Sequence, residues 1–230
     1  MFWPLTAAVE ALAGRIAEAG GAPTFPPPEV IDAALGTLAN VRFERQRPVS
    51  RRRRGPRDPS MMYDARIIHA GCVPTRPGSW HDLMNALVWA TFPLAKRALH
   101  ERQHGLVVLP APGVSARRPR ELDALALLDE GGLVVVAPEA LDDEDAVAGA
   151  LMRHEATAIV FGHAIYEGII LGREAPLGSA ICVRGNPVAV RDVLLAHADR
   201  ALSGTIADRA ELLDPSQMLR LTRVVYAPGR

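Results

Sequence analysis

The chain has little cysteine and no long apolar segment. Its 230 residues include two cysteines, Cys72 and Cys182, which suit reduced thiols in a cytoplasm better than a disulfide scaffold. No apolar run reaches about 18 residues, so we expect no helix that spans a membrane. Because Glu10, Arg15 and Glu18 interrupt the N-terminal segment, which also lacks a basic start, we expect no secretory signal.

The chain also lacks an excess of charge of either sign. Its 26 Lys and Arg residues balance 26 Asp and Glu residues, which argues against a nucleic-acid coat or a polybasic membrane binder. Only one of the basic residues is lysine, Lys96, and the others are arginines. With abundant Ala, Gly and Pro, this bias is typical of a GC-rich genome and lowers the weight of arguments from arginine. Length and composition predict a single globular domain over residues 1–230.

Residues 47–60 have almost no apolar side chains and contain the run Arg51, Arg52, Arg53 and Arg54. Such a segment cannot offset its own ordering entropy, so we expect an exposed loop within the domain. Two interpretations stay open. The run is a solvated linker, or it is a nucleic-acid-binding arm that contacts phosphates.

Apolar periodicity predicts that strands and helices alternate in the second half of the chain. Helices are expected over 4–19, 29–38, 93–103, 119–131, 142–155, 163–171 and 187–202. On the last of them, Val190, Val193, Leu194 and Ala198 are expected to face inward. Strands are expected over 62–68, 133–137, 157–161 and 180–183. A hairpin turning at Gly131-Gly132 competes with the helix over 119–131. The pattern predicts an α/β or α+β fold with a small parallel or mixed sheet covered by helices.

Residues 80–92 form the most distinctive segment, a predicted helix with apolar residues on almost every side. A helix of this kind is buried all round, so we expect it at the centre of the fold. Ser79 is a suitable N-cap, and Asp82 three residues later completes the pattern of a capping box. Pro93 ends or kinks the helix.

Polar residues at the start of this helix are candidates for a site. His81 and Asn85 are four residues apart and therefore share one helix face. They and Asp82 either project into a shared polar pocket or satisfy local backbone groups, because each unpaired buried polar group costs about 1–3 kcal/mol. His100 and His104 lie in a polar stretch that we interpret as an exposed helix end.

A second set of candidates lies where the strand over 157–161 meets the following helix. His163 opens that helix, and Glu167 lies one turn on, a pair that suits metal binding or general-base chemistry. Ligand sites of open α/β sheets gather at such junctions. Asp129 and Glu130 end another helix, where negative charge opposes the helix dipole and can mark a bound cation. A surface ion pair and an ordinary acidic turn are the alternatives for these residues.

Several segments resemble a bacterial family known as domain of unknown function 3025. The resemblance rests on Val73-Pro74-Thr75-Arg76-Pro77-Gly78-Ser79-Trp80-His81-Asp82-Leu83-Met84-Asn85-Ala86-Leu87-Val88-Trp89 with Phe92-Pro93 and Lys96, on Tyr63-Asp64-Ala65-Arg66-Ile67, on Asp123-Ala124-Leu125 with Asp129-Glu130, and on Phe161-Gly162-His163-Ala164 with Glu167. It covers about residues 60 to 185. The C-terminal tail, which ends in Pro228-Gly229-Arg230 rather than Pro-Gly-Trp, and the arginine run depart from the family pattern. The resemblance implies a cytosolic bacterial domain and supplies no activity.

Three functions are compatible with these residues. In the first, the protein is a metal-dependent hydrolase. Its catalytic residues would be His81, Asp82, Asn85, His163 and Glu167, and its metal ligands His81, His163, Glu167, Asp129 and Glu130. Two histidines with carboxylates suit Zn, Mn or Fe. In the second, the same groups form a buried hydrogen-bond network in a non-catalytic domain. In the third, the arginine run binds nucleic acid.

Overall fold

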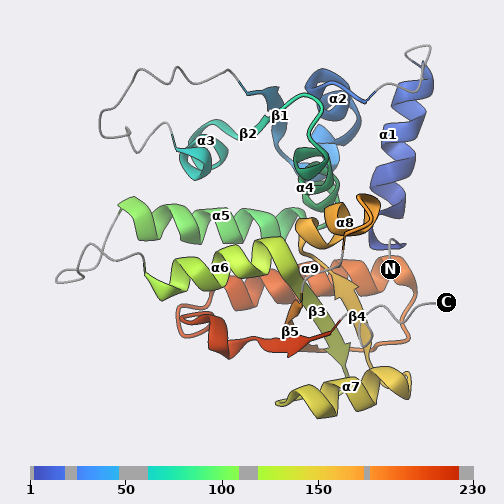
Figure 1. Cartoon of the computed structure of the whole chain (residues 1–230), viewed down its shortest axis with the longest axis vertical. Coiled ribbons are helices and arrows are strands. Elements are labelled where there is room, and N and C mark those ends of the chain that lie inside the picture. Colours follow the sequence, from blue (N-terminus) through green and yellow to red (C-terminus); the bar gives the residue numbers. More distant parts are fainter. Residues whose placement is uncertain (1–2, 19–24, 47–61, 109–118, 174–176, 223–230) are drawn as a thin grey trace.

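The computed structural model describes residues 3–18, 25–46, 62–108, 119–173 and 177–222, and helices dominate these ranges (Figure 1). The α-helices are α1 (Thr6–Glu18), α2 (Pro28–Ala39), α3 (Tyr63–Ala70), α4 (Trp80–Thr91), α5 (Pro93–Val108), α6 (Arg120–Gly131), α7 (Glu144–Met152), α8 (His163–Ile170) and α9 (Arg191–Ala207). None of the helices in these ranges has the length and apolar character needed to cross a membrane.

The strands of the described ranges form two sheets. They are β1 (Arg42–Arg45), β2 (Cys72–Thr75), β3 (Gly132–Ala137), β4 (Thr157–Val160), β5 (Gly178–Arg184) and β6 (Leu219–Leu221). The smaller sheet is the parallel pair β1-β2. The larger sheet has the order β4-β3-β5-β6, in which β3 pairs in parallel with β5, and the two outer pairings are antiparallel. It is therefore mixed, as the sequence predicts.

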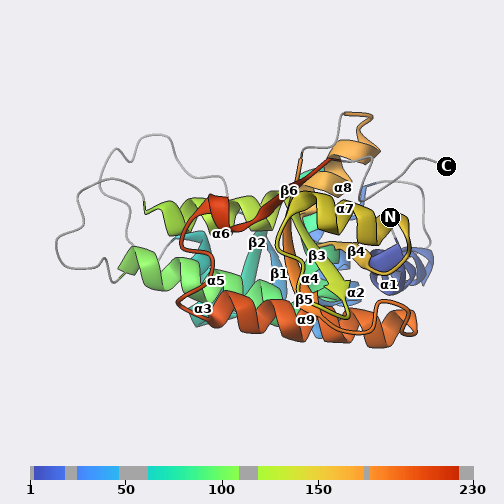
Figure 2. The same ribbon diagram turned by 90° about the horizontal axis from the view of Figure 1, so that it is seen from below.

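Helices cover both faces of the larger sheet. Figure 2 shows α9 on one side of β3 and β5, and α6 and α7 on the other. All six residues of β3 are buried, which agrees with the uninterrupted apolar run of this central strand. The smaller sheet lies with α2 and α3 in the other half of the molecule (Figure 1). The expectation of an α/β fold is confirmed.

Helix α4 is buried where the two halves meet. It packs against α1, α2, α5 and α8, and each residue from Leu83 to Trp89 is buried. The first turn is less enclosed, since Trp80 is 40 % exposed. Pro93 separates α4 from α5, as expected for a residue that cannot continue the hydrogen-bond ladder. The polar first turn of α4 therefore lies at the edge of the core.

Most predicted elements are present with small shifts of their ends. Helix α6 confirms the helix over 119–131 rather than the hairpin. Asp143 caps α7, and its Oδ1 accepts a hydrogen bond of 2.7 Å from the amide of Ala146. That helix ends at Met152, earlier than the predicted residue 155.

Three expectations are wrong. Residues 63–70 form α3 rather than a strand, because Ala65 and Ile67 are buried on a helical segment that packs against α5. Leu194 and Ala198 of α9 are buried as expected, but Val190 and Val193 are 75 % and 60 % exposed, because α9 begins only at residue 191. The capping box at Ser79 is only half formed. Ser79 Oγ accepts from the Asp82 amide, but the Asp82 carboxylate turns to Arg76.

Candidate functional site

Three helices bring their polar ends together beside the larger sheet. His81 lies in the first turn of α4, Glu130 in the last turn of α6, and His163 is the first residue of α8. The approach of α8 to α6 depends on Gly162, whose amide donates 2.8 Å to the carbonyl of Gly132. A Cβ atom on Gly162 would lie 2.5 Å from the carbonyl oxygen of Glu130, so only glycine allows this contact.

The three side chains converge on one point. His81 Nε2 and His163 Nε2 are 3.1 Å apart, and Glu130 Oε2 lies 3.6 Å from His163 Nε2. One ligand atom from each of the three residues lies within 4.8 Å of the other two. Two nitrogens bound to one tetrahedral zinc ion are separated by about 3.3 Å. The spacing therefore fits a shared metal ion.

Each imidazole has a carboxylate on its Nδ1 side. His81 Nδ1 is 3.0 Å from Glu167 Oε2, and His163 Nδ1 is 3.8 Å from Asp129 Oδ1. An ionised carboxylate only accepts hydrogen bonds, so Glu167 favours a proton on Nδ1 of the neutral His81 ring. The 3.8 Å separation at His163 is too long for a hydrogen bond. His81 Nε2 then offers its lone pair toward His163 Nε2, as a hydrogen-bond acceptor or as a metal ligand.

The charges around the cluster are unbalanced. Burial, opposed by Asp129 and reinforced by Lys96, lowers the pKa of His163 to about 3. Burial together with the negative charge of Asp129 raises the pKa of Glu130. Within the described part of the chain, His163 Nδ1 is buried and has no hydrogen-bond partner. A neutral ring and a carboxylate in an unfavourable negative field are suitable ligands for a cation.

Asp129 joins the cluster to a buried ion pair. Lys96, from α5, is fully buried, and its Nζ lies 2.5 Å from Asp129 Oδ1. Burial opposes the ionisation of Asp129, but the charge of Lys96, with a smaller contribution from His163, outweighs it and holds the pKa of Asp129 below the usual range. Asp129 therefore meets the ammonium on one side and the His163 ring on the other.

Asn85 belongs to this network rather than to the imidazole cluster. Its Oδ1 accepts 2.7 Å from Lys96 Nζ, and its Nδ2 donates 3.0 Å to the hydroxyl of Tyr63. Burial raises the pKa of Tyr63, with a further contribution from the negative charge of Asp129. Neither Lys96 nor Tyr63 was expected as a site residue. The signal in the sequence was that Lys96 is the only lysine among many arginines.

Asp82 lies apart from the converging atoms. Its carboxylate accepts from the backbone amide and the guanidinium of Arg76, at 2.5 and 2.6 Å. Burial opposes ionisation of Asp82, yet these hydrogen bonds and the Arg76 charge lower its pKa. The carboxylate thus fixes the segment that leads into α4.

His100 is buried, contrary to the expectation of an exposed helix end. The helix continues to Val108, so residue 100 lies in its middle and turns inward. Its Nδ1 is 2.8 Å from Asp64 Oδ1, and its ring stacks on Trp89 with centroids 5.4 Å apart. The spacing of apolar residues could not predict that His100 is buried, because a histidine counts as polar and its partner Asp64 lies far away in the sequence.

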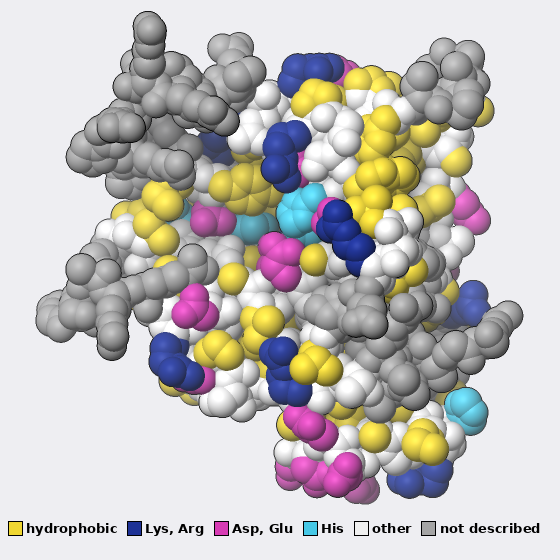
Figure 3. All heavy atoms as spheres, in the orientation of Figure 1, with side chains coloured by type: hydrophobic (Ala, Val, Ile, Leu, Met, Phe, Trp, Pro, Cys, Tyr) yellow, Lys and Arg dark blue, Asp and Glu magenta, His cyan; other side chains and the backbone are white. Residues whose placement is uncertain are grey.

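The cluster is open to solvent on one side. The side chains of His81 and Glu130 are 35 % and 50 % exposed, whereas that of His163 is 2 % exposed. Figure 3 shows histidine and acidic side chains side by side on the surface where the upper and lower halves meet. A ligand can therefore reach the converging atoms from outside.

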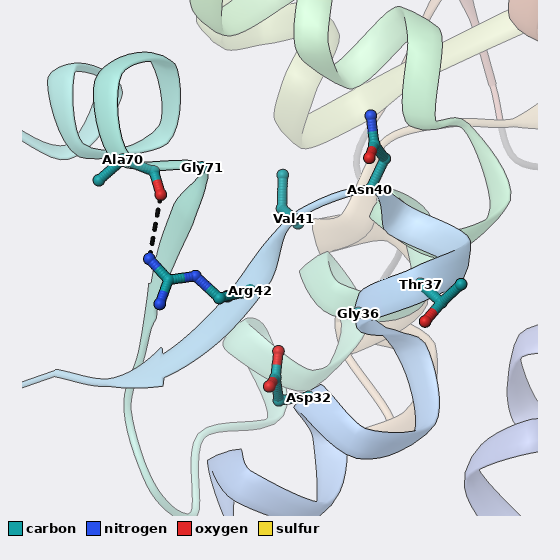
Figure 4. A pocket seen from close by; sticks show the side chains of 8 residues that line it. All are labelled: Asp32, Gly36, Thr37, Asn40, Val41, Arg42, Ala70 and Gly71. Atoms are coloured by element: carbon teal, nitrogen blue, oxygen red, sulfur yellow. Dashed lines mark hydrogen bonds between the residues drawn. The ribbon is translucent and has the colours of Figure 1, made fainter.

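Two cavities lie elsewhere. One of about 440 Å³ lies between α2, β1 and the end of α3 (Figure 4). Its polar side chains support the fold, since Arg42 donates to the carbonyl of Ala70 and Asp32 accepts from the amide of Phe43. The other, of about 530 Å³, includes Cys182, whose pKa burial raises to about 11. A thiol with that pKa is a poor nucleophile near neutral pH.

The fold and the cluster define an α/β protein with a His/Glu/His group at the meeting of three helices. Residues 50–223 match the family described as protein of unknown function (DUF3025), and the chain belongs to this family. The match confirms the resemblance seen in the sequence. No curated protein and no solved structure matches the chain.

Proposed function

We propose that His81, Glu130 and His163 bind a divalent metal ion and that the protein is a metal-dependent hydrolase. The observation that carries the proposal is the convergence of three ligand atoms within 4.8 Å from three separate helices. The carboxylate of Glu167 supports it, because metal-binding histidines usually direct the other ring nitrogen to such a group.

The number of ligands favours catalysis over a structural role. Structural zinc sites have four protein ligands, whereas catalytic sites have three and leave a position for water or substrate. Here three side chains converge, and two of them are partly exposed. A metal ion in such a position lowers the pKa of bound water to about 7 and so supplies a nucleophile for hydrolysis.

The donor set also limits the metal. Two imidazoles and one carboxylate suit Zn, Mn or Fe, whereas Mg and Ca prefer oxygen ligands alone. Glu167 would hold the His81 ring in the tautomer that offers Nε2. Asp129 lies 3.8 Å from His163 Nδ1 and makes no hydrogen bond to it. Neither carboxylate needs to bind the ion directly.

A structural role for the same residues is the second candidate. The observation in its favour is the fully buried Lys96, which joins α5 to α4 through Asn85 and to α6 through Asp129. In this case the network fixes the packing of the helices and no metal is needed. The substitution His81→Ala would then lower stability and leave the metal content at background.

Elemental analysis of protein purified without a His tag distinguishes the two candidates. We expect close to one Zn, Mn or Fe per chain, lost in His163→Gln and retained in His69→Gln, a control at an exposed histidine outside the cluster. Less than about a tenth of a metal ion per chain, with no thermal stabilisation on adding metal, would overturn the proposal.

Three further expectations belong to this proposal. We place the protein in the cytoplasm as a single domain, which the two free cysteines support. The run Arg51–Arg54 falls outside the described residues, so nucleic-acid binding stays a separate prediction. It is tested by changing those four residues to Ser. An unchanged affinity for DNA and RNA, without a steep dependence on salt, would contradict it.

A further inference from the structure

A directional chain of hydrogen bonds runs from the core to the surface beside the His/Glu/His cluster. It begins at Lys96, whose side chain is fully buried, with Nζ 5.7 Å from the ring centre of Trp89 and 6.0 Å from that of Phe161. It continues through Asn85 to Tyr63. Each member comes from a different helix, namely α5, α4 and α3.

The chemistry of lysine sets the direction of the chain. An ammonium group only donates hydrogen bonds, so the atom of Asn85 that faces Lys96 must be the carbonyl Oδ1. The amide nitrogen of Asn85 then faces Tyr63 and donates to its oxygen. The hydroxyl oxygen is used as an acceptor, and its own hydrogen must point elsewhere.

That hydrogen has no acceptor among the residues that the structure describes. The residue Tyr63 as a whole is 39 % exposed, but its hydroxyl is buried against Asn85. Burial of its hydroxyl and the charge of Asp129 raise its pKa, which keeps the proton in place at neutral pH. The result is a fixed hydrogen-bond donor with an unused hydrogen.

The chain lies next to the cluster. Asn85 is one helical turn after His81 on the same face of α4. At its inner end, Lys96 shares Asp129 with His163. We infer that Tyr63 donates a hydrogen bond to an oxyanion bound at the metal centre, and that Lys96 and Asn85 are positioning residues that fix the direction of this donor. The inference rests on the proposed metal site.

Lysine is needed at the base of the chain. The ammonium is compact, and its donors reach Asn85 and Asp129 in a space bounded by two aromatic rings. A guanidinium is larger and planar and would not fit the same contacts. The contacts at position 96 therefore suit the one lysine in a chain whose other basic residues are arginine.

A phosphate titration tests the inference. The full-length protein is loaded with Co²⁺, freed of excess metal and titrated with inorganic phosphate while the cobalt absorption is recorded. We expect Tyr63→Phe to bind the metal as the parent does and to bind phosphate about 10-fold more weakly, because a hydrogen bond to a charged group is lost. Lys96→Arg should show the same loss with the tyrosine intact.

Tyr166→Phe is the matched control. Its hydroxyl donates 2.8 Å to the buried carbonyl of Val160, so its removal should lower stability without changing phosphate affinity. Equal phosphate affinity for Tyr63→Phe and the parent, or no phosphate binding by the metal-loaded parent, overturns the inference while the metal site stands. If the parent binds no metal, the proposed function fails and the inference fails with it.

Discussion

Two pairs of histidines in this protein have the same spacing and different surroundings. His81 and His163 have their Nε2 atoms 3.1 Å apart, and so do His69 and His104, which join α3 to α5 at the surface. Only the first pair is combined with a third His, Cys, Asp or Glu ligand within the described residues. The distance between two imidazoles is therefore not what makes the first pair a candidate metal site.

The surrounding groups make the difference. The first pair has Glu130 beside it, Glu167 hydrogen-bonded to His81 Nδ1, Asp129 3.8 Å from His163 Nδ1, and one ring that is almost completely buried. The rings meet edge to face in both pairs, but the second pair lies at the surface. Outer carboxylates and burial fix ring orientation and exclude water, so affinity for a metal should depend on them.

The largest effect should follow from removing the buried ion pair between Lys96 and Asp129, which lies beside the histidine pair His81–His163 and not beside the surface pair. Lys96→Met leaves the carboxylate of Asp129 buried without its cation, and we expect a loss of about 3–5 kcal/mol in the free energy of unfolding. Urea unfolding measures it. Arg97→Ala removes an exposed ion pair with Glu101 and should cost less than about 1 kcal/mol. Similar losses of unfolding free energy for Lys96→Met and Arg97→Ala would contradict the view that the ion pair of Lys96 with Asp129 is buried and costly to break.

Lowering the pH should destabilise the metal-free protein, because His163 of the first pair resists protonation in the folded state. The pKa of His163 is lowered to about 3, so below pH 6.5 the unfolded chain takes up a proton that the folded protein does not. Stability should therefore fall with decreasing pH, by up to about 3 kcal/mol between pH 6.5 and pH 4. His163→Gln should flatten this dependence in urea unfolding, and His69→Gln should leave it in place.

The two pairs should differ sharply in metal affinity. We expect His163→Ala to weaken binding of Zn²⁺ at least about 100-fold, since it removes a ligand and not only an outer partner. His69→Ala should leave the affinity unchanged. Competition with a chromogenic chelator measures both. Equal losses would show that the surface pair binds the ion instead.

A smaller effect should follow from changing an outer carboxylate of the first pair. Glu167→Gln keeps the size of the side chain but weakens its hold on His81 Nδ1–H, and metal affinity should fall about 10–100-fold. Glu155→Gln, at an exposed ion pair with Arg153, is the control and should have no effect. A variant at Glu167 that binds as the parent does would remove this carboxylate from the site.

The sequence predicts the strongly patterned parts of the fold. Apolar runs predict the strands β3, β4 and β5, and cap and proline signals predict the helices α4 and α6. The predicted ends of these elements lie within a few residues of the observed ends. It does not predict β1, because Arg42–Arg45 is short, charged and half exposed and becomes a strand only by pairing with β2. Segment 63–70 has β-branched residues, yet its packing against α5 makes it a helix.

The sequence predicts only part of the candidate site, because the rest depends on contacts between segments that are far apart in the chain. Helix starts and strand ends identify His81 and His163 as polar groups in apolar surroundings, and the structure brings them together. The choice of Glu130 over Glu167 as the third converging group depends on how α6 meets α8, which is a tertiary contact. The chain from Lys96 to Tyr63 spans three helices and has no local pattern.

The contact at Gly162 has a consequence for how this surface can change over time. The position carries no functional atom, yet a single methyl group there would collide with the backbone at the end of α6 and push the two helices apart. Saturation mutagenesis should therefore find it as intolerant as the histidine beside it. A residue can be indispensable for the room it leaves rather than for anything it contributes.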